Sequence, residues 1–236
     1  MELPRRRATP HLEYAVRIAH GHMHTQDGVA STGAGTVKVV TDSVACLPDD
    51  LARDYDIDLI PVRISVAGRT YSDNEEDLPP ALVDAYRVTD IDTTPWPPEH
   101  YARIYSDTGP RHASIVHVVA FSRFTSTMSL AQEGAILARK QHPELEIEIV
   151  DSGATGMAQG FVALAAARAA QAGATIEECC QAAREMADRL ISIFALESLD
   201  HVARTGRVTR LAAWASSLLR VTPVVKLSQG REQPLF

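Results

Sequence analysis

The chain has 236 residues, of which 45% are hydrophobic and 22% charged, and a formal net charge of −7 at pH 7. This composition is typical of a globular protein with one large or two small domains. Apart from Arg5-Arg-Arg7 there is no basic cluster, which argues against nucleic-acid binding. No run of 18 or more apolar residues predicts a membrane span, and no apolar run after the arginines predicts a secretory signal. The only cysteines, Cys46, Cys179 and Cys180, indicate a reduced, cytoplasmic protein.

Residues 1–35 are predicted to form a flexible extension, and they hold four of the nine histidines. Three of them alternate in His20-Gly-His-Met-His24, and alternate residues of an extended segment share a face. Transition-metal binding there is one interpretation. An exposed, mobile extension without metal is the favoured interpretation.

From Thr36 onward, strand and helix patterns alternate, which predicts a parallel, doubly wound sheet. We expect strands at 37–40, 59–66, 113–121, 145–150 and 193–196. We expect helices at 49–54, 81–86, 99–105, about 128–140, 161–172, 176–191, 199–204 and 211–219. The helix at 176–191 follows a capping box formed by Thr175 and Glu178. Residues 223–227 and 232–236 are expected to pair as a hairpin.

The central stretch of the chain is a buried strand that runs into a turn rich in hydroxyls. The turn contains Ser122, Thr125, Ser126, Thr127 and Ser129, and a helix follows it. Ligands of open α/β sheets bind at the carboxyl ends of the strands, and the N–H groups of a helix N-terminus attract anions. The cluster therefore predicts either an anion site or only a helix cap, and the pattern alone leaves both open.

Three further loops follow predicted strands or precede helices and should meet at the same sheet edge. They are Thr41-Asp42-Ser43, Thr93-Thr94 and Asp151-Ser152-Gly153. Asp42 and Asp151 could hold Mg²⁺ there, which makes a Mg²⁺-dependent phosphohydrolase the alternative function. The favoured interpretation of both aspartates is structural, because such residues commonly accept backbone N–H bonds after a strand. No histidine lies in these loops to act as a general base.

Six segments in this order resemble motifs of the DegV family of bacterial fatty-acid-binding proteins. The match extends from about Val37 to Pro234. Thr41-Asp-Ser-Val-Ala-Cys-Leu-Pro48 is similar to T-D-S-T-A-D-L-P, and Thr93-Thr-Pro-Trp-Pro-Pro-Glu99 to T-S-Q-P-S-P-E. Ser122-Arg-Phe-Thr-Ser-Thr-Met-Ser-Leu-Ala131 resembles S-K-L-S-G-T-Y-Q-S-A. The others are Val150-Asp-Ser152, Leu199-Asp-His-Val-Ala-Arg-Thr-Gly-Arg-Val208 and Leu218-Leu-Arg-Val-Thr-Pro223.

The resemblance implies a two-lobed α/β protein that binds a long-chain fatty acid between its lobes, without a cofactor or a metal. It implies no catalysis by the chain itself, because in the family a separate kinase phosphorylates the bound carboxylate. The family's carboxylate contacts fall on Thr93 and Thr125, and its Gly next to the second contact is Ser126 here. Arg207 falls on a conserved arginine and is expected to dock the kinase. The remaining expected ligand contacts are Ser43, Thr94 and Ser122. The apolar residues of the 161–172 helix are candidates for the wall of the tail pocket, although for any single one of them a place in the core is the favoured interpretation.

We expect an N-terminal α/β lobe at 36–155 and a smaller, incomplete C-terminal α/β lobe at 156–236. Family members usually continue for several elements beyond the hairpin, whereas this sequence stops at Phe236. A shortened scaffold that binds no ligand is therefore a third interpretation.

Overall fold

A computed structural model describes residues 37–66, 68–73, 91–195 and 224–235, which all belong to one compact unit. The predicted N-terminal extension, the helices expected at 81–86, 199–204 and 211–219, and Arg207 lie outside the described residues. The division into lobes near residue 155 stays a prediction.

The main sheet has four parallel strands in the order β2-β1-β6-β7. They are β1 (Val37–Asp42), β2 (Ile57–Ile60), β6 (Ser114–Val119) and β7 (Glu146–Asp151). The chain leaves β1 to form β2 on one side and returns to form β6 on the other side of β1. The carboxyl ends of β1 and β6 therefore flank the point where the strand order reverses, which is where doubly wound folds bind ligands.

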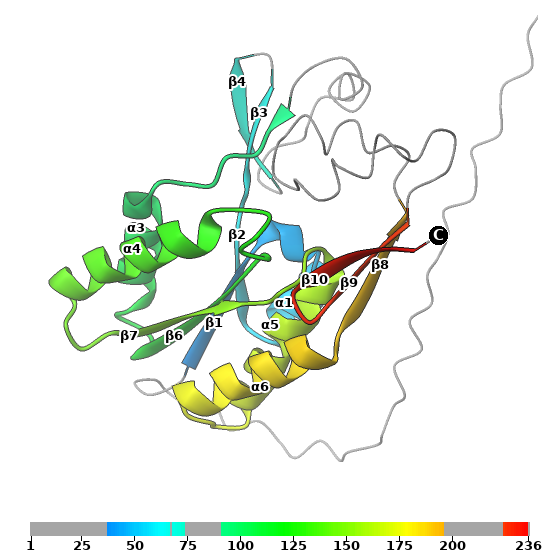
Figure 1. The fold of residues 1–236 in the computed structure, drawn as a ribbon. Coiled ribbons are helices and arrows are strands. Elements are labelled where there is room, and N and C mark those ends of the chain that lie inside the picture. Colours follow the sequence, from blue (N-terminus) through cyan, green and yellow to red (C-terminus); the bar gives the residue numbers. More distant parts are fainter. Residues whose placement is uncertain (1–36, 67, 74–90, 196–223, 236) are drawn as a thin grey trace, which may run out of the picture. The chain divides into compact units, whose positions relative to one another are not determined.

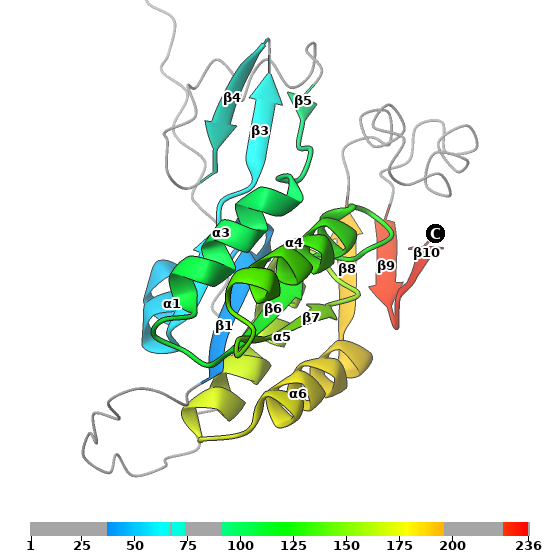
Figure 2. The same ribbon diagram turned by 90° about the vertical axis from the view of Figure 1, so that its left-hand side faces the viewer.

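Helices cover both faces of this sheet (Figures 1 and 2). On one face lie α3 (Pro98–Thr108) and α4 (Thr127–Gln141), and on the other lie α5 (Met157–Gln171) and α6 (Ile176–Arg189). Successive strand residues point to opposite faces, so the apolar runs of β1 and β6 fill both cores. The α3/α4 face buries Val40, Ile115 and Val119, and the α5/α6 face buries Val39, Val116 and Val118. The predicted doubly wound α/β fold is confirmed.

Two small antiparallel sheets complete the described structure. In the first, β8 (Ile191–Ala195), β9 (Val224–Ser228) and β10 (Arg231–Leu235) have the order β10-β9-β8. The predicted hairpin turns at Gln229 and Gly230, whose φ angles of 49° and 63° are those of a type I′ turn. In the second, β3 (Arg63–Val66), β4 (Arg69–Ser72) and β5 (Ile91–Asp92) have the order β4-β3-β5.

The single strand expected at 59–66 is wrong, because the chain divides it into β2 and β3, which belong to different sheets. Pro61 follows β2 directly, and a proline has no N–H with which to continue a ladder. Other local predictions hold. The helix α1 (Asp49–Asp54) has the expected bounds, and at α6 Thr175 N–H donates to Glu178 Oε2 over 2.8 Å while Glu178 N–H donates to Thr175 Oγ1.

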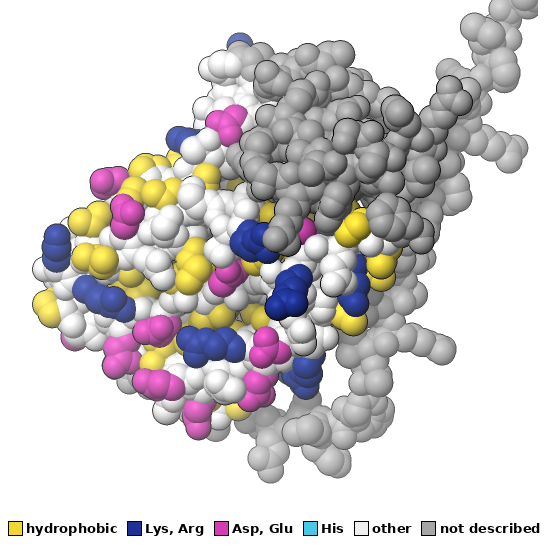
Figure 3. Space-filling view, in the orientation of Figure 1, with side chains coloured by type: hydrophobic (Ala, Val, Ile, Leu, Met, Phe, Trp, Pro, Cys, Tyr) yellow, Lys and Arg dark blue, Asp and Glu magenta, His cyan; other side chains and the backbone are white. Residues whose placement is uncertain are grey.

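Basic and acidic side chains are interleaved on the face of the molecule drawn in Figure 3, and acidic side chains gather in its lower part, where α6 lies in Figure 1. None of the helices among the described residues combines the length and apolar character needed to span a membrane.

Candidate functional site

Two loops meet at the carboxyl ends of β1 and β6 and enclose two adjoining cavities. One loop, residues 93–97, leads from β5 into α3, and the other, residues 120–126, leads from β6 into α4. We call the smaller cavity, of about 350 Å³, the inner cavity. The outer cavity has a volume of about 640 Å³ and is more open to solvent. Both lie at the reversal point of the strand order, so the fold places them where a ligand site is expected.

The inner cavity has a wall that is mostly apolar. Trp96 anchors this wall because its Nε1–H donates to the Pro61 carbonyl over 2.6 Å, and the guanidinium of Arg63 lies 5.5 Å from the centre of its ring. Polar groups interrupt the wall at a few points, as is usual for small-molecule pockets. The residues that line the inner cavity include Asp42, Ile60, Val62, Ile91, Thr93, Thr94, Trp96, Tyr101, Phe124, Thr125 and Thr127.

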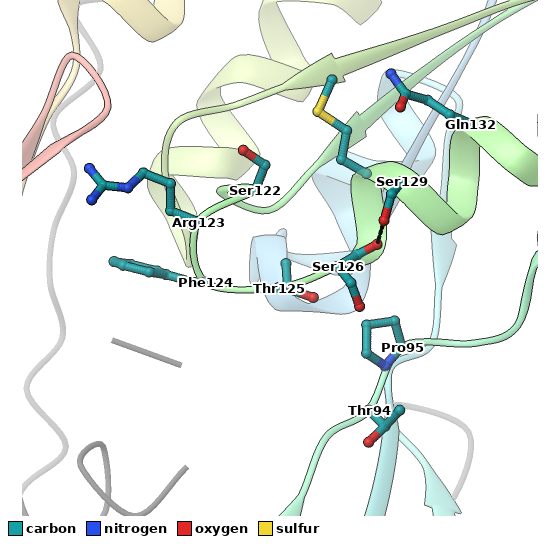
Figure 4. Close-up of a pocket in the computed structure, with 10 residues that line it drawn as sticks. Thr94, Pro95, Ser122, Arg123, Phe124, Thr125, Ser126, Ser129 and Gln132 are labelled. Atoms are coloured by element: carbon teal, nitrogen blue, oxygen red, sulfur yellow. Dashed lines mark hydrogen bonds between the residues drawn. The ribbon is translucent and has the colours of Figure 1, made fainter. Parts of the chain in front are cut away.

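The outer cavity is lined mainly by the hydroxyl-rich turn and the first residues of α4 (Figure 4). In Figure 4, Thr125 and Ser126 face Pro95 and Thr94 across the cavity. The Ser129 hydroxyl donates to the Ser126 carbonyl over 2.9 Å. The other lining residues are Ser122, Arg123, Phe124, Met128 and Gln132.

The structure brings five of the six predicted ligand contacts together. Thr94 and Thr125 line both cavities, Thr93 lines the inner one, and Ser122 and Ser126 line the outer one. Ser43 lines neither cavity, although its chain neighbours Asp42 and Val44 line the inner one. Its buried hydroxyl donates to Asp73 Oδ2 over 2.6 Å and accepts the Val62 N–H over 3.0 Å, so it holds the loop after β1 to the segment between β2 and β3.

Thr125 is hydrogen-bonded to Thr127, another member of the hydroxyl-rich turn. Its Oγ1 lies 2.8 Å from the Oγ1 of Thr127 and accepts the Thr127 N–H over 3.3 Å. Tyr101, on α3, lines the same inner cavity as Thr125 and Thr127, and burial raises its pKa to about 12. The sequence places Thr127 in the hydroxyl cluster, but nothing in the sequence connects it to Tyr101, which lies 26 positions earlier on another helix.

The two aspartates of the alternative function each have protein donors. Asp42 Oδ1 accepts the Gln159 amide over 2.9 Å and its Oδ2 accepts the Ala120 N–H over 3.4 Å. Asp151 Oδ1 accepts the Gly153 N–H over 2.9 Å and also the Ser122 N–H. Because β6 separates β1 from β7, the strands carrying the two carboxylates are about 10 Å apart. This arrangement fits the structural interpretation of both residues.

Asp42 is nevertheless unusual, because burial raises the pKa of its carboxyl from 3.8 to about 6, against the lowering effects of the Gln159 and backbone hydrogen bonds. This carboxyl lines the inner cavity. Within the described ranges, no group of three His, Cys, Asp or Glu side chains is arranged to hold a metal ion.

The expectation that the 161–172 helix walls a tail pocket is wrong for the two cavities, because no residue of α5 lines them. Its buried residues, including Val162, Ala163 and Ala166, pack in the core between the sheet and α6. Gly160 allows this close approach, since a Cβ there would lie 2.8 Å from the Ala45 carbonyl oxygen. The favoured interpretation of single residues of this helix as core therefore holds for Val162, Ala163 and Ala166, since an alanine-rich helix has the same sequence pattern in a tight core as beside a tunnel.

Arg123 links the hydroxyl-rich turn to the β9–β10 hairpin. Its guanidinium lies 3.1 Å from Glu232 Oε2 and close to the Gly230 carbonyl, 3.5 Å away. The Glu232 side chain is only 3% exposed, whereas that of Arg123 is 45% exposed. A buried carboxylate needs such a partner, so this contact fixes one side of the turn.

Comparison with known proteins agrees with this geometry. The sequence profile described as "Uncharacterised protein, DegV family" matches residues 36–235. A DegV domain-containing protein of Streptomyces coelicolor is 32% identical over 203 residues, which are 84% of this chain and 70% of the relative.

Two solved structures establish the fold. A DegV family protein from Thermus thermophilus, described for its fatty acid binding, has a TM-score of 0.75 at 24% identity. DegV from Bacillus subtilis, described as a fatty acid binding protein, has a TM-score of 0.72 at 24% identity. Each alignment covers 85% of this chain and 71% of the solved chain. From its sequence and its fold, the chain belongs to the DegV family.

Proposed function

We propose that this protein binds a long-chain fatty acid non-covalently at the carboxyl ends of β1 and β6. The observation that carries the proposal is that Thr93 and Thr125, from two separate loops, line one mostly apolar cavity. Such a cavity suits an acyl chain, and the hydroxyls suit a carboxylate. The fatty acid binding described for the family members from Thermus thermophilus and Bacillus subtilis supports this choice of ligand.

In this proposal the carboxylate lies where the two cavities adjoin. Thr125 and Thr94 line both cavities, so a head group beside them can reach the more open outer cavity. Thr93, Ser122 and Ser126 supply the other hydroxyls nearby. A hydrogen bond to a charged group contributes about 1.5–3 kcal/mol, so each direct contact is worth about tenfold to a hundredfold in affinity.

The acyl tail then occupies the inner cavity, against Ile60, Val62, Ile91 and Trp96. Each buried CH₂ contributes about 0.8 kcal/mol, so affinity rises with chain length until the cavity is full. The chain acts as a carrier rather than as an enzyme and presents the carboxylate to a separate fatty acid kinase. Arg207 docks that kinase, and the cytoplasmic location indicated by the cysteine content stays a prediction.

The test is a binding titration with saturated fatty acids of increasing length on the parent, Thr93→Val and Thr125→Val. Valine keeps the shape of threonine and removes its hydroxyl. Thr70→Val is the matched control, because Thr70 is exposed on β4 and its hydroxyl pairs with Ser65. We expect length-dependent binding that is about tenfold to a hundredfold weaker in the two site variants and unchanged in the control. Parent-like binding by both site variants, or affinity independent of length, would contradict the proposal.

The kinase step needs a separate measurement. With a fatty acid kinase and ATP, Arg207→Ala should bind fatty acid like the parent and form less acyl phosphate. Equal acyl-phosphate formation by parent and variant would remove Arg207 from the proposal and leave fatty acid binding intact.

A further inference from the structure

Arg63, the first residue of β3, is a cation without an acidic partner in the wall of the inner cavity. None of the ion pairs between described residues includes it, and its buried Nε atom has no hydrogen-bond acceptor in this part of the chain. Its guanidinium instead lies 5.5 Å from the centre of the Trp96 ring. A guanidinium has N–H donors and no acceptor, so this one remains able to bind an anion.

The contacts of Trp96 hold this guanidinium in place. The Trp96 Nε1–H donates to the Pro61 carbonyl over 2.6 Å, and the ring stacks on His100 with 4.2 Å between the ring centres. Cation–π attraction involves the face of the ring and uses no hydrogen-bond acceptor, so it leaves the N–H groups of Arg63 available. The cation is therefore positioned at the cavity before any ligand binds.

The charges of the wall favour one position for an anionic head group. Among the described residues of this wall, Asp42 is the only acid and Arg63 the only base. Asp42 does not neutralise Arg63, because its carboxylate accepts the Gln159 amide and the Ala120 N–H instead. A ligand carboxylate is attracted to Arg63 and repelled by ionised Asp42, so it should lie on the β3 side of the cavity.

The same side of the cavity carries hydroxyls of the proposed head-group site. Strands β3 and β5 pair antiparallel, with Ser65 opposite Asp92. Continuing this register by two residues would place Arg63 opposite Thr94. Thr94 lines both cavities, as does Thr125. A carboxylate beside these hydroxyls is therefore within reach of a long arginine side chain.

We propose that Arg63 forms an ion pair with the carboxylate of the bound lipid and makes the site selective for ionised fatty acids over neutral lipids of the same length. The inference rests on the proposed function and deepens it. Hydroxyls alone discriminate weakly, since they also bond to the hydroxyl of a fatty alcohol. The fork of a guanidinium matches a carboxylate through two parallel N–H bonds, and an alcohol cannot replace this contact. The ion pair also offsets the cost of bringing a charged group into a mostly apolar cavity.

The experiment compares the affinities for hexadecanoic acid and hexadecanol. Arg63→Met keeps an unbranched apolar side chain beside Trp96 and removes the charge. We expect it to weaken binding of the acid by about tenfold to a hundredfold and to leave binding of the alcohol unchanged. Arg63→Lys keeps the charge without the fork, so its affinity for the acid should lie between those of Arg63→Met and the parent. Arg69→Met is the matched control, because Arg69 is an exposed arginine of β4 in the same small sheet and lines neither cavity.

The alcohol separates charge recognition from packing. If Arg63→Met weakens binding of both lipids by the same factor, the inference is overturned, because Arg63 then only supports Trp96. Parent-like affinity of Arg63→Met for the acid, with weak binding by Thr125→Val, would overturn the inference and leave the proposed function standing. A parent protein that binds neither lipid would overturn the proposed function itself. Should Arg63→Met fail to fold, Arg63→Lys gives the same test, because it should lose affinity for the acid and keep its affinity for the alcohol.

Discussion

The two faces of the parallel sheet are covered in different ways. Under α5 and α6 most buried side chains are small and apolar, with alanines, valines and the two cysteines Cys179 and Cys180 in contact, and one fully buried amide, Gln159 of α5, donates to Thr41 and Asp42. Under α3 and α4 the core also contains Tyr101, Tyr105 and the fully buried His117, and Thr127 is buried at the start of α4. Both cavities have α4 or α3 residues in their walls.

This difference shows how one sheet serves two purposes. Small apolar side chains let helices pack closely and contribute stability without specific partners. Buried polar groups must be paired to avoid a large desolvation cost, so they fix particular distances and directions. The α3/α4 face, which has more buried polar groups and forms walls of both cavities, is therefore the one suited to orient a head group, and the α5/α6 face mainly supports the sheet.

The largest expected effect concerns His117, which is fully buried on the α3/α4 face of the sheet. Burial lowers the pKa of His117 from 6.5 to about 3, so the folded protein holds it neutral. Between these pH values only the unfolded chain takes up a proton, and the free energy of unfolding therefore falls as the pH drops below 6.5. The full loss is about 5 kcal/mol at about 1.4 kcal/mol per pH unit. The measurement is urea unfolding of the parent and His117→Asn between pH 7.5 and 4.5. The free energy of unfolding should fall less on acidification in the variant than in the parent, and parallel pH profiles would contradict this.

Asp42 should act with the opposite sign. Its pKa is raised from 3.8 to about 6, so between these values the folded protein keeps a proton that the unfolded chain has released. The resulting contribution of Asp42 to the free energy of unfolding is fully present below pH 3.8 and is lost as the pH rises through 6. It amounts to about 3 kcal/mol. In the same unfolding series, the free energy of unfolding of Asp42→Asn should rise relative to that of the parent as the pH increases from 4 to 7. A variant with the same slope as the parent would show that the carboxyl has an ordinary pKa.

Two glycines give a matched comparison of the faces. An added Cβ would lie 2.7 Å from the Tyr101 Cβ at Gly134 and 2.8 Å from the Ala45 carbonyl oxygen at Gly160. Both changes to alanine should destabilise the protein by about 1–3 kcal/mol, because each overpacks a close contact. Only Gly134→Ala shifts α3 against α4, so only this variant should also weaken fatty acid binding. Equal affinities of the two folded variants would remove the distinction between the faces.

The smallest expected effect concerns only the α5/α6 face of the sheet. Thr175→Ala removes the side-chain cap of α6 and should cost about 1 kcal/mol in the free energy of unfolding. Fatty acid affinity of the folded variant should equal that of the parent, because α6 lines neither cavity. Weaker binding by this variant would mean that the α5/α6 face does more than support the sheet.

Much of the fold follows from local sequence patterns. Apolar, β-branched runs located β1, β6 and β7, and the capping box located the start of α6. The split between β2 and β3 was missed although Pro61 signals it. The hydroxyl clusters located the loops that meet at the cavities. That Tyr101 of α3 and Thr127 of α4 line the same cavity was not predictable, because it depends on how closely the two helices cross, and that distance is a tertiary property.

The pairing of β1 with β6 has a consequence for the order in which the molecule assembles. The Thr41 hydroxyl donates to the Val118 carbonyl over 2.7 Å, and these residues lie 77 positions apart in the chain. Closing a loop of this length costs about 4 kcal/mol of chain entropy before any contact across it forms. Pairings between such distant segments slow folding. Since both cavities lie at the end of this pair of strands, they exist only after its closure. A bound lipid would therefore stabilise the finished sheet by mass action and could not serve as a template for its formation.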